Sequence, residues 1–269
     1  MPSRIAIIGA GNLGSWLAVH LARAGHAVHF CTRRDPGPLQ IAGLPPLTLP
    51  YYLDASPPAD FAFLTTKAYD NRTALLRVNA PVLAAIQNGL SQPGIPVLSY
   101  VYIEQQNGVR HAFPPPGPHL TIPPGTPVVD LLRTTPIKFH EAPDFLSAAW
   151  RKMLHNCVSN PLTAIAGRGL EILREPLFHD WAKRILDESL PLAAVAGATV
   201  DGAEILATLA SYPPGTRTSM LQDRLAGRPL EIRTLNGHLV ELGRQFGMPT
   251  PVNEYLVRIV ESAGTLRSV

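Results

Sequence analysis

The sequence is poor in cysteine and in charge. Its 269 residues include only two cysteines, Cys31 and Cys157, which supply neither a disulfide framework nor the ligand set of a metal site. Charged residues make up 16% of the chain and the formal net charge is +3, so no dense basic stripe is present to bind nucleic acid. We therefore expect reduced thiols, no metal, no nucleic-acid partner and a small anionic ligand.

Long uninterrupted apolar runs and a secretory signal are also lacking. The most apolar stretch, 190–210, contains Asp201 and Glu204, which favours two buried helices over a membrane span. The N-terminal segment enters a strand pattern without the charged head and apolar stretch of a secretory signal. No internal repeat is visible. These absences predict a soluble cytoplasmic protein that has no membrane partner.

The first half of the chain alternates short apolar runs with helical patterns, which predicts a parallel sheet covered by helices. The predicted strands are 4–8, 27–31, 61–65, 82–87 and 95–102, and a helix is predicted at 13–24. Prolines cluster in 36–58 and 114–127, where they predict loops.

Helical periodicity dominates from about Asp144, with breaks predicted at Pro161, 167–169, Pro191, 213–215 and Pro229. We place a domain boundary near residue 140. The sequence therefore predicts an α/β domain with a doubly wound sheet over 1–140 and an all-helical domain over 141–269.

A glycine-rich motif lies between the first predicted strand and the first helix. Gly9 permits a tight turn, Gly11 lets the backbone approach a pyrophosphate, and Gly14 permits close packing of the helix. The free N–H groups of the helix N-terminus favour an anion. The pattern indicates a Rossmann-type domain in which a dinucleotide contacts Gly9, Ala10, Gly11, Asn12, Leu13 and Gly14.

The end of the second predicted strand discriminates between NAD and NADP. An NAD enzyme usually carries a carboxylate there for the ribose hydroxyls, whereas a guanidinium pairs with the 2′-phosphate of NADP. This chain places Arg33 at that position, and Asp35 follows one or two residues too late unless the strand end bends. The pattern favours NADP.

Two further polar residues follow predicted strands: Lys67 after 61–65, and Asn88 in a Gln-Asn-Gly sequence after 82–87. Because the carboxyl ends of parallel strands form the ligand crevice of an open sheet, we expect both side chains at the cofactor site. The alternative is a solvated lysine and an ordinary Asn-Gly turn.

Lys152, Asn156 and Asn160 recur at every fourth residue of a predicted helix, so they form one polar stripe among apolar neighbours. An ammonium beside two amides suits ketone reduction, because it can stabilise the developing alkoxide and donate a proton. His155, within this segment, is interpreted as a packing residue. The alternative is a structural polar stripe that faces the other domain.

A third polar cluster contains Ser219 and Glu231. Ser219 either caps a helix, with Gln222 completing a capping box, or holds a substrate carboxylate at the helix start. Glu231 is either a surface acid or the counter-ion of Lys152. The spacing leaves both choices open.

Taken together, these motifs resemble the ketopantoate reductase (2-dehydropantoate 2-reductase) family over most of the chain. The most specific segments are the Lys152 stripe, which ends in Asn-Pro-Leu-Thr-Ala, and the Ser-Met-Leu-Gln-Asp sequence that begins at Ser219. The resemblance implies an NADPH-dependent reduction of ketopantoate to pantoate, with the substrate between the two domains.

The resemblance also implies roles for individual residues. Lys152 would be the general acid, and Glu231 would lie at the nicotinamide end of the site. The implied substrate ligands are Asn88, Lys152, Asn156, Asn160 and Ser219, and the implied cofactor ligands beyond the glycine motif are Arg33, Lys67, Asn88 and Glu104. Glu104 departs from the small residue that the family commonly has there, and the segment 36–60 is shorter than usual.

Three alternatives to this function remain open. The substrate is a related 2-keto acid, the enzyme is a β-hydroxyacid or opine-type dehydrogenase, or the protein senses NADPH without catalysis. The assembly that we expect for this protein is a homodimer.

Overall fold

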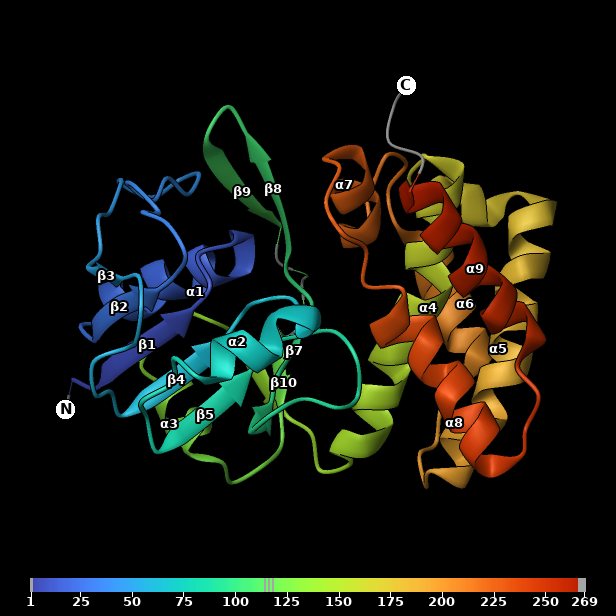
Figure 1. Cartoon of the computed structure of the whole chain (residues 1–269), viewed down its shortest axis with the longest axis horizontal. Helices are drawn as coiled ribbons and strands as arrows, with labels where there is room; N and C mark the ends of the chain where they lie inside the picture. Colours follow the sequence, from blue (N-terminus) through green and yellow to red (C-terminus); the bar gives the residue numbers. More distant parts are fainter. Residues whose placement is uncertain (1, 114, 116, 118, 266–269) are drawn as a thin grey trace. The chain divides into compact units, whose positions relative to one another are not determined.

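The computed structural model describes residues 2–265 except Pro114, Pro116 and Pro118. The chain divides into two compact units, residues 1–145 and 146–269 (Figure 1). The domain boundary predicted at 140/141 would fall within strand β11 (Phe139–Glu141), which pairs with another strand of the first unit.

The first unit is built on a parallel six-stranded sheet with the order β3-β2-β1-β4-β5-β6. This is the strand order of a Rossmann-type sheet, so the predicted fold class is confirmed. The strands are β1 (Arg4–Ile8), β2 (Ala27–Cys31), β3 (Tyr51–Tyr52), β4 (Phe61–Leu64), β5 (Val82–Ala85) and β6 (Ile95–Pro96).

Helices cover both faces of this sheet, because alternate residues of a strand point to opposite sides. Ile5 and Ile7 of β1 belong to a core that includes α1 (Asn12–Arg23) and α3 (Pro127–Leu132). Ala6 and Ile8 belong to a second core with Ala74 of α2 (Asn71–Leu75). The apolar strands are therefore buried on both sides.

The apolar run predicted as one strand at 95–102 is divided between two sheets. β6 joins the parallel sheet, and its last ladder bond is donated by Val97 to Ala85. The next strand, β7 (Leu98–Ser99), pairs antiparallel with β10 (Leu120–Ile122) in a separate sheet of order β11-β10-β7. The prediction of one continuous strand was wrong, because an apolar run does not specify its pairing partner.

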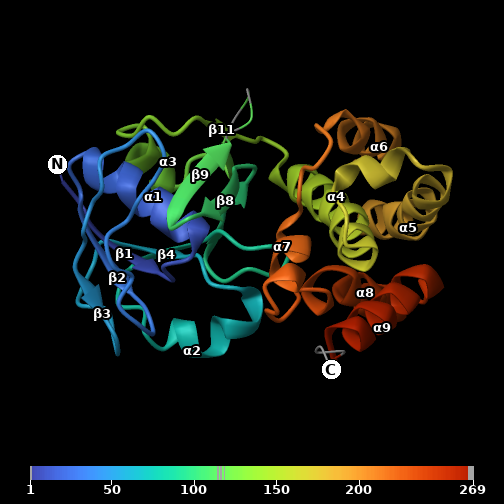
Figure 2. The same ribbon diagram turned by 90° about the horizontal axis from the view of Figure 1, so that it is seen from above.

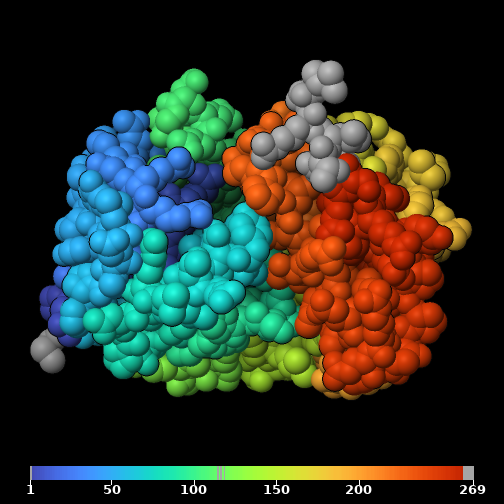
Figure 3. All heavy atoms as spheres, viewed as in Figure 1, coloured from blue at the N-terminus to red at the C-terminus, as the bar shows by residue number. Residues whose placement is uncertain are grey.

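The sequence predicted that the two proline-rich segments are loops, but each of them also contains a strand. The first contains β3, an edge strand of the parallel sheet, and the second contains β10. A hairpin also lies between 95 and 114, formed by β8 (Tyr102–Gln106) and β9 (Val109–Phe113). Its exposed tip projects from the surface of the first unit (Figure 3).

The described part of the second unit is helical, as predicted. Its helices are α4 (Phe145–Ala166), η2 (Leu170–Arg174), α5 (Pro176–Val195), α6 (Gly202–Ser211), α7 (Ser219–Leu225), a π-helical turn η3 (Arg233–Gly237), α8 (His238–Phe246) and α9 (Pro251–Thr265). Helix α5 packs against α6, α8 and α9 (Figure 2). Across the described residues, every helix is too short or too polar to cross a membrane.

The helix breaks predicted at Pro161 and Pro191 are wrong, because α4 and α5 continue through these residues. Each proline removes one helical hydrogen bond but leaves the helix intact where another donor satisfies the carbonyl. The break predicted at 167–169 is confirmed: α4 ends before Gly167, whose φ is +67°.

Candidate functional site

The glycine motif forms a tight turn between β1 and α1. Gly9 has a φ of +109°, which favours glycine, and a Cβ there would lie 3.0 Å from the Thr66 side chain. The hydroxyl of Thr65 donates to the carbonyl oxygens of Ile8 and Gly9 at 3.1 and 2.9 Å. The loop after β4 therefore holds the turn in place.

Gly11 and Gly14 are required for different reasons. A Cβ on Gly14 would overlap the carbonyl oxygen of Gly9 and lie 2.5 Å from the Thr65 hydroxyl, so packing alone explains this glycine. A Cβ on Gly11 would meet no atom within 4 Å. Packing therefore leaves Gly11 unexplained, whereas close approach of a ligand to the backbone explains it.

The remaining residues of the motif support this turn. Ala10 and Leu13 pack against the core of the first unit, and Asn12 donates to the Ile103 carbonyl of β8 at 3.3 Å. Gly11 is the N-cap of α1, and the first turn of α1 contains no acidic residue. The N–H groups at this helix end thus meet no carboxylate from their own turn, and they suit a pyrophosphate.

Arg33 lies just beyond β2, and its side chain is 76% exposed. Its guanidinium lies 3.4 Å from the carboxylate of Asp70, at the end of the short helix η1 (Ala68–Asp70), whose N-cap is Lys67. Because β1 pairs with both β2 and β4, Arg33 and Lys67 follow the two strands that flank β1. Asp35 instead accepts a hydrogen bond from the Gly37 N–H at 2.7 Å.

The loop after β5 is tied to the loop after β4. The Gln87 amide donates to the Thr66 carbonyl at 2.8 Å and exchanges hydrogen bonds with the Asn71 side chain. Asn88 follows directly, and Gly89 has a φ of +96°. The Asn-Gly turn is therefore present, and it lies beside the loop that carries Lys67.

Glu104 lies on the hairpin strand β8. Its carboxylate accepts hydrogen bonds from the Tyr102 hydroxyl and, at 3.3 Å, from the Gln106 amide. The neighbouring Ile103 carbonyl accepts from Asn12, so the hairpin contacts the start of α1 one residue from Glu104. Its predicted role as a cofactor ligand stays a prediction.

The polar stripe of the second unit lies on α4, as predicted. Asn156 and Asn160 are 8% and 3% exposed, and Lys152 is half-buried. Desolvation of its ammonium lowers the pKa of Lys152 from 10.5 to about 8. An ammonium with that pKa can release its proton near neutral pH.

His155 lies next to Asn156 in the stripe and is half-buried, with both ring nitrogens shielded from solvent. Burial, together with the charge of Lys152, lowers the pKa of His155 to about 3, although the Asn156 amide acts in the opposite direction. Neither ring nitrogen has a hydrogen-bond partner of good geometry among the described residues, and the ring stacks edge-on against Tyr212. His155 is therefore neutral and packs as an aromatic group.

Ser219 is not the N-cap of α7, which is one of the two roles that the sequence left open for it. The N-cap of α7 is Thr218, whose side chain accepts from the Leu221 N–H at 3.2 Å. Gln222 donates to the Arg217 carbonyl at 3.5 Å and closes no capping box. The capping interpretation was wrong because the cap lies one residue earlier, so Ser219 lies in the first turn of the helix and is exposed.

Glu231 is 5% exposed, so the interpretation as a surface acid was wrong. Its carbonyl oxygen accepts the N–H groups of Thr234 and Leu235 at 3.1 and 3.2 Å, next to the π-helical bond of η3 from the Gly237 N–H to the Ile232 carbonyl at 3.0 Å. A buried carboxylate requires polar or charged neighbours. Its predicted partnership with Lys152 stays a prediction.

Two connections within the second unit were missed by sequence reasoning. The Thr163 hydroxyl of α4 bonds to the Thr218 hydroxyl, and Asn236 of η3 donates to the Cys157 carbonyl of α4. The first links the stripe to Ser219 and the second links it to the segment of Glu231. The only signal in the sequence was the proline at position 161, which leaves the Cys157 carbonyl without a helical donor.

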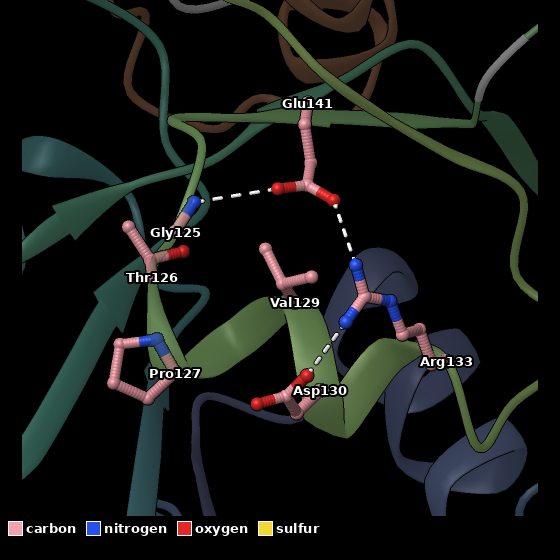
Figure 4. A pocket seen from close by; sticks show the side chains of 7 residues that line it. All are labelled: Gly125, Thr126, Pro127, Val129, Asp130, Arg133 and Glu141. Carbon is pink, nitrogen blue, oxygen red and sulfur yellow. Dashed lines mark hydrogen bonds and ion pairs between the residues drawn. The ribbon is translucent and has the colours of Figure 1, made fainter.

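A shallow hollow of about 430 Å³ lies elsewhere in the first unit, at the start of α3 (Figure 4). Arg133 bridges Asp130 and Glu141 there, and the Gly125 N–H donates to Glu141. None of the predicted site residues lines it. Arg133 is already paired with both carboxylates, so we assign the hollow no function.

The chain matches models of a known family in both halves. Residues 5–95 match "Ketopantoate reductase PanE/ApbA", and residues 144–263 match the C-terminal model of the same family. A 2-dehydropantoate 2-reductase of Mycobacterium tuberculosis is 30% identical, with 98% of each chain covered. One of Archaeoglobus fulgidus is 29% identical, with 96% of each covered.

Solved structures share the fold. The dimeric ketopantoate reductase of Staphylococcus aureus superposes with a TM-score of 0.85 at 19% identity, over 97% of this chain and 99% of that one. A D-mandelate dehydrogenase solved with NADH gives the same TM-score at 22% identity and the same coverage. Together with the two family models, which cover most of the sequence, these likenesses assign the chain to the ketopantoate reductase family.

Proposed function

We propose that this protein is an NADPH-dependent 2-dehydropantoate 2-reductase, which reduces ketopantoate to pantoate. The observation that carries the proposal is the stripe on α4, in which a lysine with a pKa of about 8 is followed by two buried amides. That arrangement supports proton donation to a ketone oxygen, and it occurs in a member of the ketopantoate reductase family.

The first unit would hold the cofactor. The turn at Gly9 and Gly11 would contact the pyrophosphate through backbone N–H groups, because no side chain obstructs Gly11. Arg33 and Lys67 would bind the 2′-phosphate that distinguishes NADPH from NADH. Asn88 and Glu104 complete the proposed set of cofactor contacts.

The second unit would perform the proton chemistry. The cofactor supplies the hydride that reduces the ketone carbon. The Lys152 ammonium stabilises the negative charge that develops on the ketone oxygen and then donates a proton to it. Asn156, Asn160 and Ser219 bind the hydroxyl and carboxylate of the substrate without adding a charge.

Glu231 is the second proposed catalytic residue. As a buried carboxylate in the same unit, it would balance the charge of Lys152 and favour the protonated amine. This role is tested by Glu231→Gln, which preserves the shape and removes the charge. We expect a lower kcat and a basic limb of the pH profile that moves to lower pH.

The proposed assembly is a homodimer, and the proposed location is the cytoplasm. One structural neighbour is described as a dimeric ketopantoate reductase, which motivates the assembly. The location is motivated by two buried, free cysteines, which a reducing compartment would keep in that state. Light scattering during size-exclusion chromatography would test the dimer: a monomeric mass at working concentration would refute it.

The direct test measures oxidation of NADPH with ketopantoate, pyruvate, 2-ketoisovalerate and an aromatic 2-keto acid. We expect the highest kcat/KM with ketopantoate. Preference for another acid would refute the substrate, and an enzyme that turns over only the hydroxy acid in the oxidative direction would indicate a dehydrogenase.

A cofactor sensor is distinguished by Lys152→Ala. For an enzyme we expect kcat to fall about 10²-fold or more while the Kd for NADPH is unchanged, since a positioned general acid supplies roughly that factor. The exposed Arg151→Ala is the matched control on the same helix. A sensor would bind NADPH and show no turnover with any of these acids.

A further inference from the structure

Helix α4 continues through Pro161, although this residue has no N–H to donate. In a regular helix the N–H of residue 161 would bond to the carbonyl of Cys157, and the proline ring crowds that oxygen. Cys157 is 0% exposed, so water cannot replace the missing donor. A buried carbonyl without a partner is costly, so another group must supply the hydrogen bond.

Asn236 supplies that hydrogen bond. Its side-chain amide donates to the Cys157 carbonyl at 3.0 Å, and Asn236 itself is 0% exposed. The residue lies in η3, a turn of π-helix, which is a rare geometry that often occurs at functional sites. The Asn236 amide therefore occupies the place that the proline leaves empty in the helical ladder.

Neighbouring groups fix the orientation of this amide. Asn236 donates a second hydrogen bond to Asn253 at 2.9 Å, and Asn253 in turn donates to the Glu188 carboxylate at 2.7 Å. The Oδ1 atom of Asn236 is buried and has no partner among the described residues. Asn236 thus uses both donor hydrogens of its amide, and its Oδ1 is left without a partner in the part of the chain that the structure describes.

A second helical proline shows that burial creates the requirement. Pro191 lies inside α5, and the carbonyl left without a donor belongs to Asp187. Both residues are exposed, so water can satisfy that oxygen. A side-chain donor such as Asn236 is therefore needed because the Cys157 carbonyl is buried. A proline in an exposed part of a helix does not require one.

The position of Cys157 connects this bond to the proposed chemistry. Cys157 lies between Asn156 and Asn160 of the polar stripe, and η3 begins two residues after Glu231. We propose that Asn236 is a positioning residue, which holds the Lys152 stripe of α4 in register with the segment that carries Glu231. The inference rests on the proposed function, in which Lys152 and Glu231 act on one substrate.

The test removes the side-chain amide of Asn236 and, in a second variant, restores a backbone N–H at position 161. We expect Asn236→Leu to lower kcat about tenfold, within the ~10²-fold loss that a misplacement of about 1 Å can cause, with the KM for NADPH unchanged. Pro161→Ala restores an N–H that can bond to Cys157. The double variant should therefore recover most of the lost kcat, and Pro161→Ala alone should resemble the wild type.

Two further variants guard against a merely structural effect. Asn236→Ala removes both donor hydrogens without added bulk or charge, so it should show the same loss and the same rescue even where leucine prevents folding. Ser189→Ala removes another buried donor to a helical carbonyl, that of Ile185, in α5. It should lower the Tm without changing kcat or the basic limb of the pH profile, whereas Asn236→Ala, which adds no charge, should shift that limb.

The outcomes separate this inference from the proposed function. Wild-type enzyme that turns over none of the keto acids would refute the function, and the inference would then depend on unfolding alone. In that case we expect the effects of the substitutions at 161 and 236 on the free energy of unfolding to be coupled in a double-mutant cycle. Additive effects would overturn the exchange of one hydrogen-bond donor for the other. With active enzyme, the inference is overturned if the double variant recovers its Tm but remains as slow as Asn236→Leu.

Discussion

The hydroxyls of Thr163 and Thr218 lie 2.7 Å apart and join the end of α4 to the N-cap of α7. Thr163 also donates to the carbonyls of Ser159 and Asn160, at 2.7 and 3.2 Å. Because Ser219 follows Thr218 directly, this pair ties the segment of Asn160 to the segment of Ser219. Both residues are proposed to bind the substrate.

Thr163→Val should therefore weaken binding of the keto acid. A buried hydrogen bond contributes about 1 kcal/mol, so we expect the KM for the keto acid to rise roughly fivefold while kcat changes little. Steady-state kinetics measure the effect. Thr163→Ser keeps the hydroxyl and should behave as wild type; an equal rise in KM for both variants would show that the methyl group matters instead.

The pH profile should report the pKa of Lys152. Burial lowers this pKa to about 8, and a general acid acts only in its protonated form. Reduction should therefore be constant below about pH 8 and fall as pH rises through it. The profile of kcat/KM against pH measures this limb, and a limb near 10.5, the ordinary lysine value, would contradict a desolvated amine.

Cofactor preference should depend on the pair formed by Arg33 and Asp70. Arg33→Ala should raise the KM for NADPH far more than the KM for NADH, because only NADPH carries the 2′-phosphate. Asp70→Asn should act in the opposite direction, since it removes the carboxylate that competes for the guanidinium. Arg34→Ala, the adjacent exposed arginine, is the control. Equal effects of Arg33→Ala on both cofactors would indicate a structural role.

Two glycines of the motif should respond differently to alanine. Gly14→Ala forces a Cβ into the Gly9 carbonyl and the Thr65 hydroxyl, so we expect a large drop in Tm. Gly11→Ala meets no neighbouring atom, so the fold should be unaffected while affinity for NADPH falls tenfold or more. Thermal unfolding and cofactor titration separate the two, and unchanged affinity in Gly11→Ala would argue against the proposed pyrophosphate contact.

The folded protein should lose stability in acid because of its buried histidines. Burial lowers the pKa of His29 below 6.5, and that of His155 to about 3. The unfolded chain therefore binds more protons below pH 6.5, and the free energy of unfolding should decrease as pH falls through that value. Denaturant unfolding between pH 7.5 and about 5 measures the slope, with the exposed His179→Gln as control. His29→Gln should flatten the slope, and an unchanged slope would exclude this residue.

Local patterns predicted much of the fold. The apolar runs of β1, β2 and β4 and the glycine motif indicated a parallel sheet, because these strands are buried on both faces. The Asn-Gly pair at 107–108 was an available hairpin signal that we did not use; both residues have positive φ, of 50° and 82°, as a type I′ turn requires. The edge strand β3 carries no comparable signal, because it has only two residues, both exposed.

Part of the candidate site could likewise be predicted from the sequence, and part could not. The spacing of Lys152, Asn156 and Asn160 was sufficient to place them on one helix, because the helical period is local. The sequence did not reveal that Thr218 rather than Ser219 caps α7, since both residues are good caps.

The sequence by itself determined the kinds of elements, the glycine turn and the polar stripe, because each depends on residues close together in the chain. Only the tertiary structure decided what satisfies the groups that those elements leave unpaired. Asn236 reaches the Cys157 carbonyl across 79 residues, and Thr218 reaches Thr163 across 55. Such partners are selected by burial, which excludes water and makes every unpaired polar atom costly, and burial exists only once the chain has folded.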